Sequence, residues 1–177
     1  MGFMDKLFGK KDEAPVPEAA PAPAARGDTV VCAPFAGTAM PLEKIDDPVF
    51  SAGVLGPGCG MEPEEETVYA PFDGCISQLT DTKHAVGITS AGGAEMLIHV
   101  GMDTVEMNGD GFSCLVKMGQ SVKKGDALMT FSVEKIKAAG HPATTAIVVT
   151  NADEFAAVEL AAEGAVERGA AVLTVKA

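Results

Sequence analysis

The chain contains an internal repeat of a short β motif, and this repeat limits the available folds more than any other feature. The segment VVCAPFAG at residues 30–37 recurs as TVYAPFDG at residues 67–74. Each copy predicts an apolar strand, a Pro-Phe pair and a glycine turn that leads into a second strand. Leu42 and Leu79 continue the match at the same spacing of 37 residues. Two copies are too few for a solenoid, so we expect one duplicated β unit packed against itself.

Other segments favour an all-β fold. Alternation places Met96 and Ile98 on one face of a strand and His99 on the other. Residues 145–150 are a β-branched run, and the 20 Gly and 11 Pro favour many turns and short strands. Residues 152–163 are rich in Ala and Glu and are predicted to be helical. We therefore expect an antiparallel β sandwich or barrel built from a duplicated motif, with short helical turns.

The first 28 residues differ in composition and predict a disordered N-terminal tail. Residues 12–28, rich in Pro and Ala, cannot bury enough apolar surface to fold and predict an extended linker. Residues 1–11 place apolar side chains on one helical face beside lysines, which suits a short helix lying on anionic lipid. An unstructured terminus is the alternative, because so short a helix is unstable alone. The residues expected to meet the membrane are Phe3, Met4, Lys6, Leu7 and Phe8.

The charge and the cysteines narrow the class of protein. A formal net charge of −12 argues against nucleic acid, whose phosphates would be repelled, and suits a protein partner with a basic face. The four cysteines include no C-x-x-C pair, and no secretory pattern follows the first lysines. No segment approaches the roughly twenty apolar residues of a membrane span. We expect a cytoplasmic protein that can be peripheral at the inner face of the membrane through residues 1–11.

The candidate chemistry lies in His84 and His99, two of the three histidines, set fifteen positions apart in short apolar segments. A neutral imidazole nitrogen is nucleophilic near neutral pH and can accept a phosphoryl group. A second imidazole can donate to a phosphate oxygen, and a hydroxyl such as that of Thr82 can fix its tautomer. A histidine in an apolar strand is more often structural than catalytic, so the assignment depends on whether the two rings meet.

Eight motifs in order resemble those of one known family. They are DPVFS (47–51), GCGM (58–61), YAPFDG (69–74), TKHA (82–85), LIHVGMDTV (97–105), NGDGF (108–112), GQSVKKGD (119–126) and VVTN (148–151). Together they resemble the glucose-type enzyme IIA of the bacterial phosphoenolpyruvate-dependent sugar phosphotransferase system. The resemblance predicts that residues 29–177 form a IIA-type phosphocarrier domain. Thr80 departs from the family, in which this position is often aromatic, so the rim of the site is expected to be more polar.

The resemblance implies an antiparallel β sandwich with a shallow apolar depression that holds both histidines. His99 would take phosphate on Nε2 from the phosphocarrier HPr and pass it to a cysteine of a IIB domain, with no metal or organic cofactor. His84 would hydrogen-bond the phosphate, and Thr82 would orient His84. The phosphorylation state would also signal to regulatory partners.

The resemblance also implies a ring of residues around the two histidines. The Gly101 carbonyl would hold Nδ1 of His99, and Asp103 would pair with a partner's arginine. Apolar side chains would exclude water and meet partner proteins. The residues expected to line the site and contact partners are Val49, Phe50, Gly101, Asp103 and Val105.

Two other classes share parts of this pattern. Lysostaphin-like zinc peptidases use a related duplicated β fold, but they need an H-x-H pair that is absent around His99. Biotinyl and lipoyl domains share the turn region at residues 119–128 and present a modified lysine, for which Lys135 and Lys137 are the candidates. Neither lysine has the usual flanking residues, and the chain is about twice too long.

Overall fold

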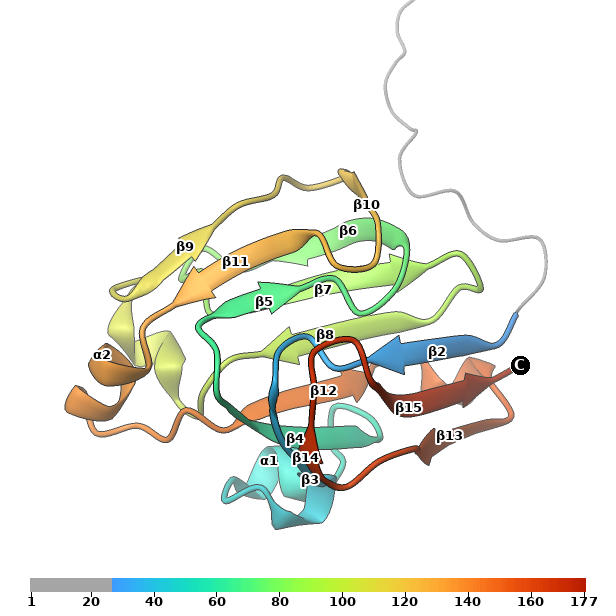
Figure 1. Ribbon diagram of the computed structural model, residues 1–177, viewed down its shortest axis with the longest axis horizontal. Helices are drawn as coiled ribbons and strands as arrows, with labels where there is room; N and C mark the ends of the chain where they lie inside the picture. Colours follow the sequence, from blue (N-terminus) through green and yellow to red (C-terminus); the bar gives the residue numbers. More distant parts are fainter. Residues whose placement is uncertain (1–26) are drawn as a thin grey trace, which may run out of the picture.

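The computed structural model describes residues 27–177, and the predictions for residues 1–11 and for the linker up to residue 26 lie outside the described residues. Its elements are short, and strands dominate (Figure 1). In chain order they are β2 (Thr29–Cys32), β3 (Gly37–Pro41), η3 (Leu42–Lys44), α1 (Pro48–Ser51), β4 (Gly58–Pro63), β5 (Thr67–Tyr69), β6 (Gly74–Leu79), β7 (Ala85–Ser90), β8 (Glu95–His99), η4 (Thr104–Met107), β9 (Phe112–Cys114), β10 (Ser121–Val122), β11 (Ala127–Phe131), α2 (Val133–Ala138), β12 (Thr145–Val149), η5 (Ala152–Glu154), β13 (Ala157–Leu160), β14 (Gly164–Val166) and β15 (Ala171–Lys176).

The strands form one large sheet and two small ones. The large sheet has eight strands in the order β10-β6-β7-β8-β12-β4-β3-β14. The small sheets have three strands each, in the orders β5-β11-β9 and β13-β15-β2. All strand pairs of the described region are antiparallel. The expected antiparallel β sandwich with short helical turns is confirmed.

The predicted duplication appears as a pseudo-two-fold arrangement of the sheets. The second strands of the repeat, β3 and β6, lie at equivalent places near opposite ends of the large sheet, and the first strands, β2 and β5, belong to the two small sheets. The copies also exchange backbone hydrogen bonds: Cys32 N–H donates to the Pro71 carbonyl at 3.0 Å, and Tyr69 N–H to the Pro34 carbonyl at 2.8 Å. The repeated motif is therefore the place where the two halves join.

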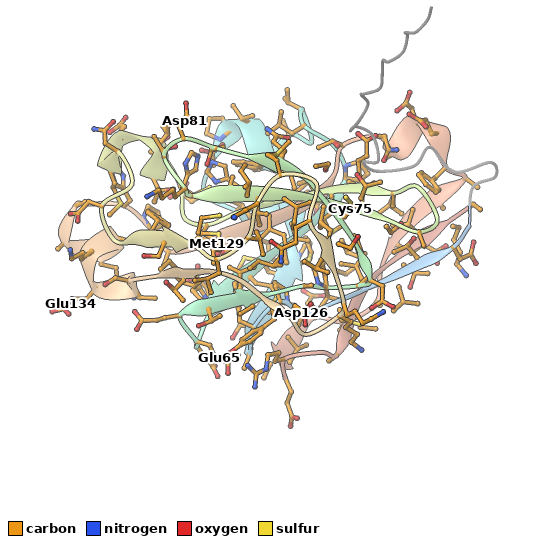
Figure 2. All side chains as sticks on the ribbon, turned by 90° about the horizontal axis from the view of Figure 1, so that it is seen from above. Glu65, Cys75, Asp81, Asp126, Met129 and Glu134 are labelled. Atoms are coloured by element: carbon orange, nitrogen blue, oxygen red, sulfur yellow. The ribbon has the colours of Figure 1, made fainter. Side chains whose placement is uncertain are left out.

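A buried apolar core fills the space between the sheets. Its largest fully buried side chains include Phe35, Met61, Ile88, Ile98 and Leu173, which come from the large sheet, from β15 of a small sheet and from the first Pro-Phe pair. Burial of such side chains is the main favourable term in folding. Figure 2 shows Met129 of β11 within this packed interior, whereas Asp81 and Glu134 project from its rim.

The prediction of a helix at residues 152–163 is wrong. This stretch contains the three-residue turn η5 and then the strand β13, which pairs with β15. Ala and Glu favour helix on intrinsic propensity, but Val158 packs against the apolar core and Leu160 pairs with Leu173. Tertiary pairing overrides local propensity here.

Candidate functional site

The two histidines lie side by side because of the register between β7 and β8. Ala85 pairs directly with His99 in that ladder, and His84 precedes Ala85 where the strand begins. The imidazole centroids are 4.7 Å apart and the rings meet edge to face at 80°. Val100 N–H donates to the His84 carbonyl at 2.8 Å, so the pairing continues past both rings. The structure thus brings together two side chains that are fifteen positions apart in the sequence.

A tight turn before β7 aims the His84 ring. Lys83 has a positive φ of 62°, and its N–H donates to the Thr80 carbonyl at 3.0 Å. Thr82 Oγ1 lies 2.6 Å from Nδ1 of His84, and only 5% of His84 is exposed. A hydroxyl that donates to Nδ1 leaves the proton on Nε2, which makes Nε2 a hydrogen-bond donor.

The turn after β8 fixes the tautomer of His99, whose proton lies on Nδ1 and not on Nε2 as in His84. His99 Nδ1 lies 2.8 Å from the Gly101 carbonyl oxygen. A carbonyl only accepts hydrogen bonds, so Nδ1 must carry the proton and Nε2 keeps its lone pair. The pair therefore holds one ring nitrogen suited to nucleophilic attack on phosphorus and a second suited to donation.

Burial keeps both rings neutral at physiological pH. It lowers the pKa of His84 from 6.5 to about 4, with a smaller contribution from the charge of His99. Burial also lowers the pKa of His99, while the Gly101 carbonyl and the charges of Asp47 and Asp103 act against it. A neutral His99 is the nucleophilic form.

The lowered pKa of His84 predicts a specific acid sensitivity. Its folded pKa of about 4 lies below the unfolded value of 6.5, so the unfolded state binds more protons as the pH falls. The wild-type chain should lose about 2 kcal/mol of unfolding free energy through this residue between pH 7 and pH 5. Urea unfolding at both pH values should show a smaller drop for His84→Gln. Equal drops in the wild type and in His84→Gln would contradict this coupling.

The short helix α1 covers His99 with an aromatic ring. The Phe50 ring centroid lies 4.9 Å from that of His99, and Phe50 is itself 6% exposed. Asp47 caps this helix, since its Oδ1 accepts from Val49 N–H at 2.9 Å and from Phe50 N–H at 3.1 Å. Pro48 occupies the first turn, where its missing N–H costs nothing.

Asp47 is a site residue that was not predicted, although its motif was noted. An Asp-Pro pair before an apolar residue is a recognisable helix start. Nothing local in the sequence places this carboxylate where its charge acts on His99. That proximity depends on the packing of α1 against the end of the histidine strands.

The other predicted residues lie on α1 and on the turn and η4 that follow β8. Val49 is 44% exposed and Val105 50% exposed, so both present apolar surface to solvent. Asp103 has a positive φ of 58° at the start of η4, and its charge raises the pKa of His99. Within residues 27–177, no group of three or more His, Cys, Asp or Glu side chains is placed to hold a metal ion. The chemistry available to these residues is acceptance of an electrophilic group by Nε2 of His99.

Comparison with known proteins agrees with the fold and with the family that the sequence motifs resemble. The family described as the phosphoenolpyruvate-dependent sugar phosphotransferase system, EIIA 1, matches residues 29–155. The glucose-specific EIIA component of Halalkalibacterium halodurans is 42% identical over 154 residues, which cover 87% of this chain and 86% of that protein. The solved structure of glucose permease IIA from Mycoplasma capricolum has a TM-score of 0.77 and 31% identity, and the match covers 84% of this chain and 96% of that one.

A third relative is much longer than this chain. The beta-glucoside-specific EIIBCA component of Dickeya chrysanthemi is 39% identical over 173 residues, which are 92% of this chain but 27% of that protein. The chain thus spans about a quarter of this relative's length.

The chain belongs to the EIIA 1 family of the phosphoenolpyruvate-dependent sugar phosphotransferase system. It is a glucose-type EIIA phosphocarrier and a phosphotransferase component, as the sequence motifs predict. The zinc-peptidase and biotinyl- or lipoyl-domain alternatives are not favoured by these matches. Across residues 27–177, no helix has both the length and the apolar character needed to span a bilayer.

Proposed function

We propose that His99 is the residue that carries the phosphoryl group. The observation that supports this most directly is the bond from Nδ1 of His99 to the Gly101 carbonyl at 2.8 Å, which leaves a lone pair on Nε2. That lone pair attacks the phosphorus of phospho-HPr, and the electrons of the broken P–N bond return to the HPr histidine. The proton stays on Nδ1, which keeps its hydrogen bond to the Gly101 carbonyl. The acidic groups Asp47 and Asp103 favour the positive charge that the ring gains.

His84 holds the transferred group in this proposal, and Thr82 sets the direction of its hydrogen bond. With Thr82 Oγ1 at 2.6 Å from Nδ1, the Nε2–H of His84 donates to a phosphoryl oxygen. The dianionic phosphoryl group next to it favours the protonated imidazole, so the pKa of His84 rises from its resting value of about 4. A positive charge then faces the phosphoryl group while the transfer proceeds.

The second step returns the site to its resting state. A cysteine thiolate of a IIB domain attacks phosphorus, the P–N bond breaks, and its electron pair returns to Nε2 of His99. The name EIIBCA of the Dickeya chrysanthemi relative supports a IIB partner. Val49, Val105 and Asp103 form the surface toward HPr and IIB, with apolar contact from the valines and an arginine partner for the aspartate. Regulatory proteins that sense the phosphorylation state would use the same surface.

The decisive experiment is phosphotransfer from phosphoenolpyruvate through purified enzyme I and HPr. The chain should gain one phosphoryl group, and the modified peptide should contain His99. Labelling should be lost in acid, as expected for a P–N bond, and should require HPr. A stable phosphoester, or labelling that does not need HPr, would contradict the proposal.

The domain arrangement extends this proposal to the N-terminus. Residues 29–177 act as the phosphocarrier domain of a cytoplasmic protein, residues 12–28 act as a linker, and residues 1–11 bring the domain to the inner face of the membrane. The mixed apolar and basic composition of the first eleven residues supports a lipid role.

The lipid role predicts a change in circular dichroism. The full chain should gain helical signal with vesicles that contain phosphatidylglycerol and should not change with phosphatidylcholine alone, because lysines add electrostatic attraction to anionic lipid. Lys6→Glu should weaken the response, whereas Lys176→Glu, at the other end of the chain, should not. An unchanged spectrum in both kinds of vesicle would count against the membrane segment.

A further inference from the structure

We infer that Thr104 is a positioning residue that fixes the tautomer of His99 by holding the turn on which the Gly101 carbonyl lies. This inference rests on the proposed role of His99. Thr104 is the first residue of η4, is completely buried, and bonds to the main chain of the turn. Its effect would therefore pass through the backbone of the turn.

The hydroxyl of Thr104 anchors the peptide unit that joins Val100 to Gly101, directly after His99. Thr104 Oγ1 donates to the Val100 carbonyl at 2.6 Å, and Val100 N–H donates to the His84 carbonyl at 2.8 Å. Val100 is also completely buried, so water does not compete for either bond. The main chain of Val100 is thus held at its N–H by the His84 carbonyl and at its own carbonyl by the Thr104 hydroxyl.

The methyl group of the same side chain restrains the next residue. Gly101 has a φ of 76°, and a Cβ atom built there would lie 2.5 Å from Cγ2 of Thr104. Glycine is required at this position because of both its backbone conformation and this close approach. Met102 N–H donates to the Pro142 carbonyl at 3.1 Å, which closes the turn on its far side.

The direction of the Gly101 carbonyl determines where the proton of His99 lies. An imidazole without a partner prefers the proton on Nε2, and the carbonyl at 2.8 Å from Nδ1 reverses that preference. If the Val100 carbonyl loses its donor, the turn can rotate and the Gly101 carbonyl can leave Nδ1. His99 then regains a proton on Nε2 and loses the lone pair that a nucleophile needs.

The test compares three full-length chains by nitrogen NMR of the histidine rings at neutral pH. The wild type and Thr104→Ser, which keeps the hydroxyl, should show His99 with the proton on Nδ1. Thr104→Val, which keeps the shape but not the hydroxyl, should show a raised share of the Nε2–H tautomer. Its rate of phosphoryl acceptance from phospho-HPr should fall about tenfold, as for loss of an outer hydrogen-bond partner of a functional histidine.

The matched control is Thr29→Val, which removes another buried threonine hydroxyl, one that bonds Ser90 Oγ at 2.8 Å outside the histidine site. The control should leave the His99 tautomer unchanged; if Thr104→Val does not fold, Thr104→Ala replaces it. A wild-type tautomer in the folded Thr104 variant would overturn the inference. A different outcome separates the two proposals. If Thr104→Val shifts the tautomer but HPr phosphorylates not even the wild type, the positioning role is supported and the proposed function is overturned.

Discussion

Replacing His99 by Gln is expected to abolish phosphoryl transfer from phospho-HPr to this chain, with a loss of about a thousandfold or more. The reason is chemical, since a neutral amide nitrogen has no available lone pair for attack on phosphorus. The measurement is incorporation of phosphate from phosphoenolpyruvate in the presence of enzyme I and HPr.

The His99 variant has a suitable control elsewhere in the domain. His141→Gln changes a histidine that lies in the loop after α2, with Nε2 4.0 Å from a carboxylate oxygen of Glu106. This control should accept phosphate at the wild-type rate, and both variants should keep the wild-type strand content in circular dichroism. Retained labelling of His99→Gln, or lost labelling of His141→Gln, would place the acceptor elsewhere.

Replacing His84 by Gln is expected to separate the two steps of the reaction. Acceptance should persist, because the nucleophile on His99 is intact and the Gln amide can still donate to a phosphoryl oxygen. Transfer to the IIB cysteine should slow by about a hundredfold, the size of effect expected when one electrostatic contribution to the transition state is lost. A thiolate and a phosphoryl group are both negative, and Gln cannot supply the positive charge that a protonated His84 brings.

Single-turnover kinetics can measure the two steps apart. The phosphorylated variant is first prepared with HPr and then mixed with a purified IIB domain, and the loss of phosphate is followed with time. Thr82→Val should give an intermediate defect, since it removes only the group 2.6 Å from Nδ1 of His84. If His84→Gln transferred to IIB at the wild-type rate while accepting phosphate slowly, the assigned roles would be reversed.

The repeated β motif explains why the fold could be predicted from sequence. The motif specifies strand, turn and strand twice. The bonds from Cys32 N–H to the Pro71 carbonyl and from Tyr69 N–H to the Pro34 carbonyl join the two copies. A second repeat went unnoticed: VKKGDALMTF from Val122 matches VERGAAVLTV from Val166. Gly125 and Gly169 in these segments have φ values of 92° and 88°. Recognition of this pair predicts β15 as a strand that corresponds to β11, but it does not reach β13 or the residues predicted to be helical.

The site was only partly predictable, for a physical reason. His84, His99 and Thr82 lie in two short segments whose residue types suggest the chemistry. The carboxylate of Asp47 and the hydroxyl of Thr104 act only because α1 and the turn after β8 fold onto these segments. Such effects depend on three-dimensional packing and hydrogen bonding between elements, and no residue spacing in the chain reveals them.

The central claim is that a single nitrogen, Nε2 of His99, carries the phosphoryl group while Nδ1 remains protonated and hydrogen-bonded to the Gly101 carbonyl. The most direct measurement is phosphorus–nitrogen NMR of the nitrogen-15-labelled chain after phosphorylation by HPr. The account predicts a scalar coupling between phosphorus and Nε2 of His99, with a proton retained on Nδ1. Coupling to Nδ1 of His99, or to either nitrogen of His84, would contradict it.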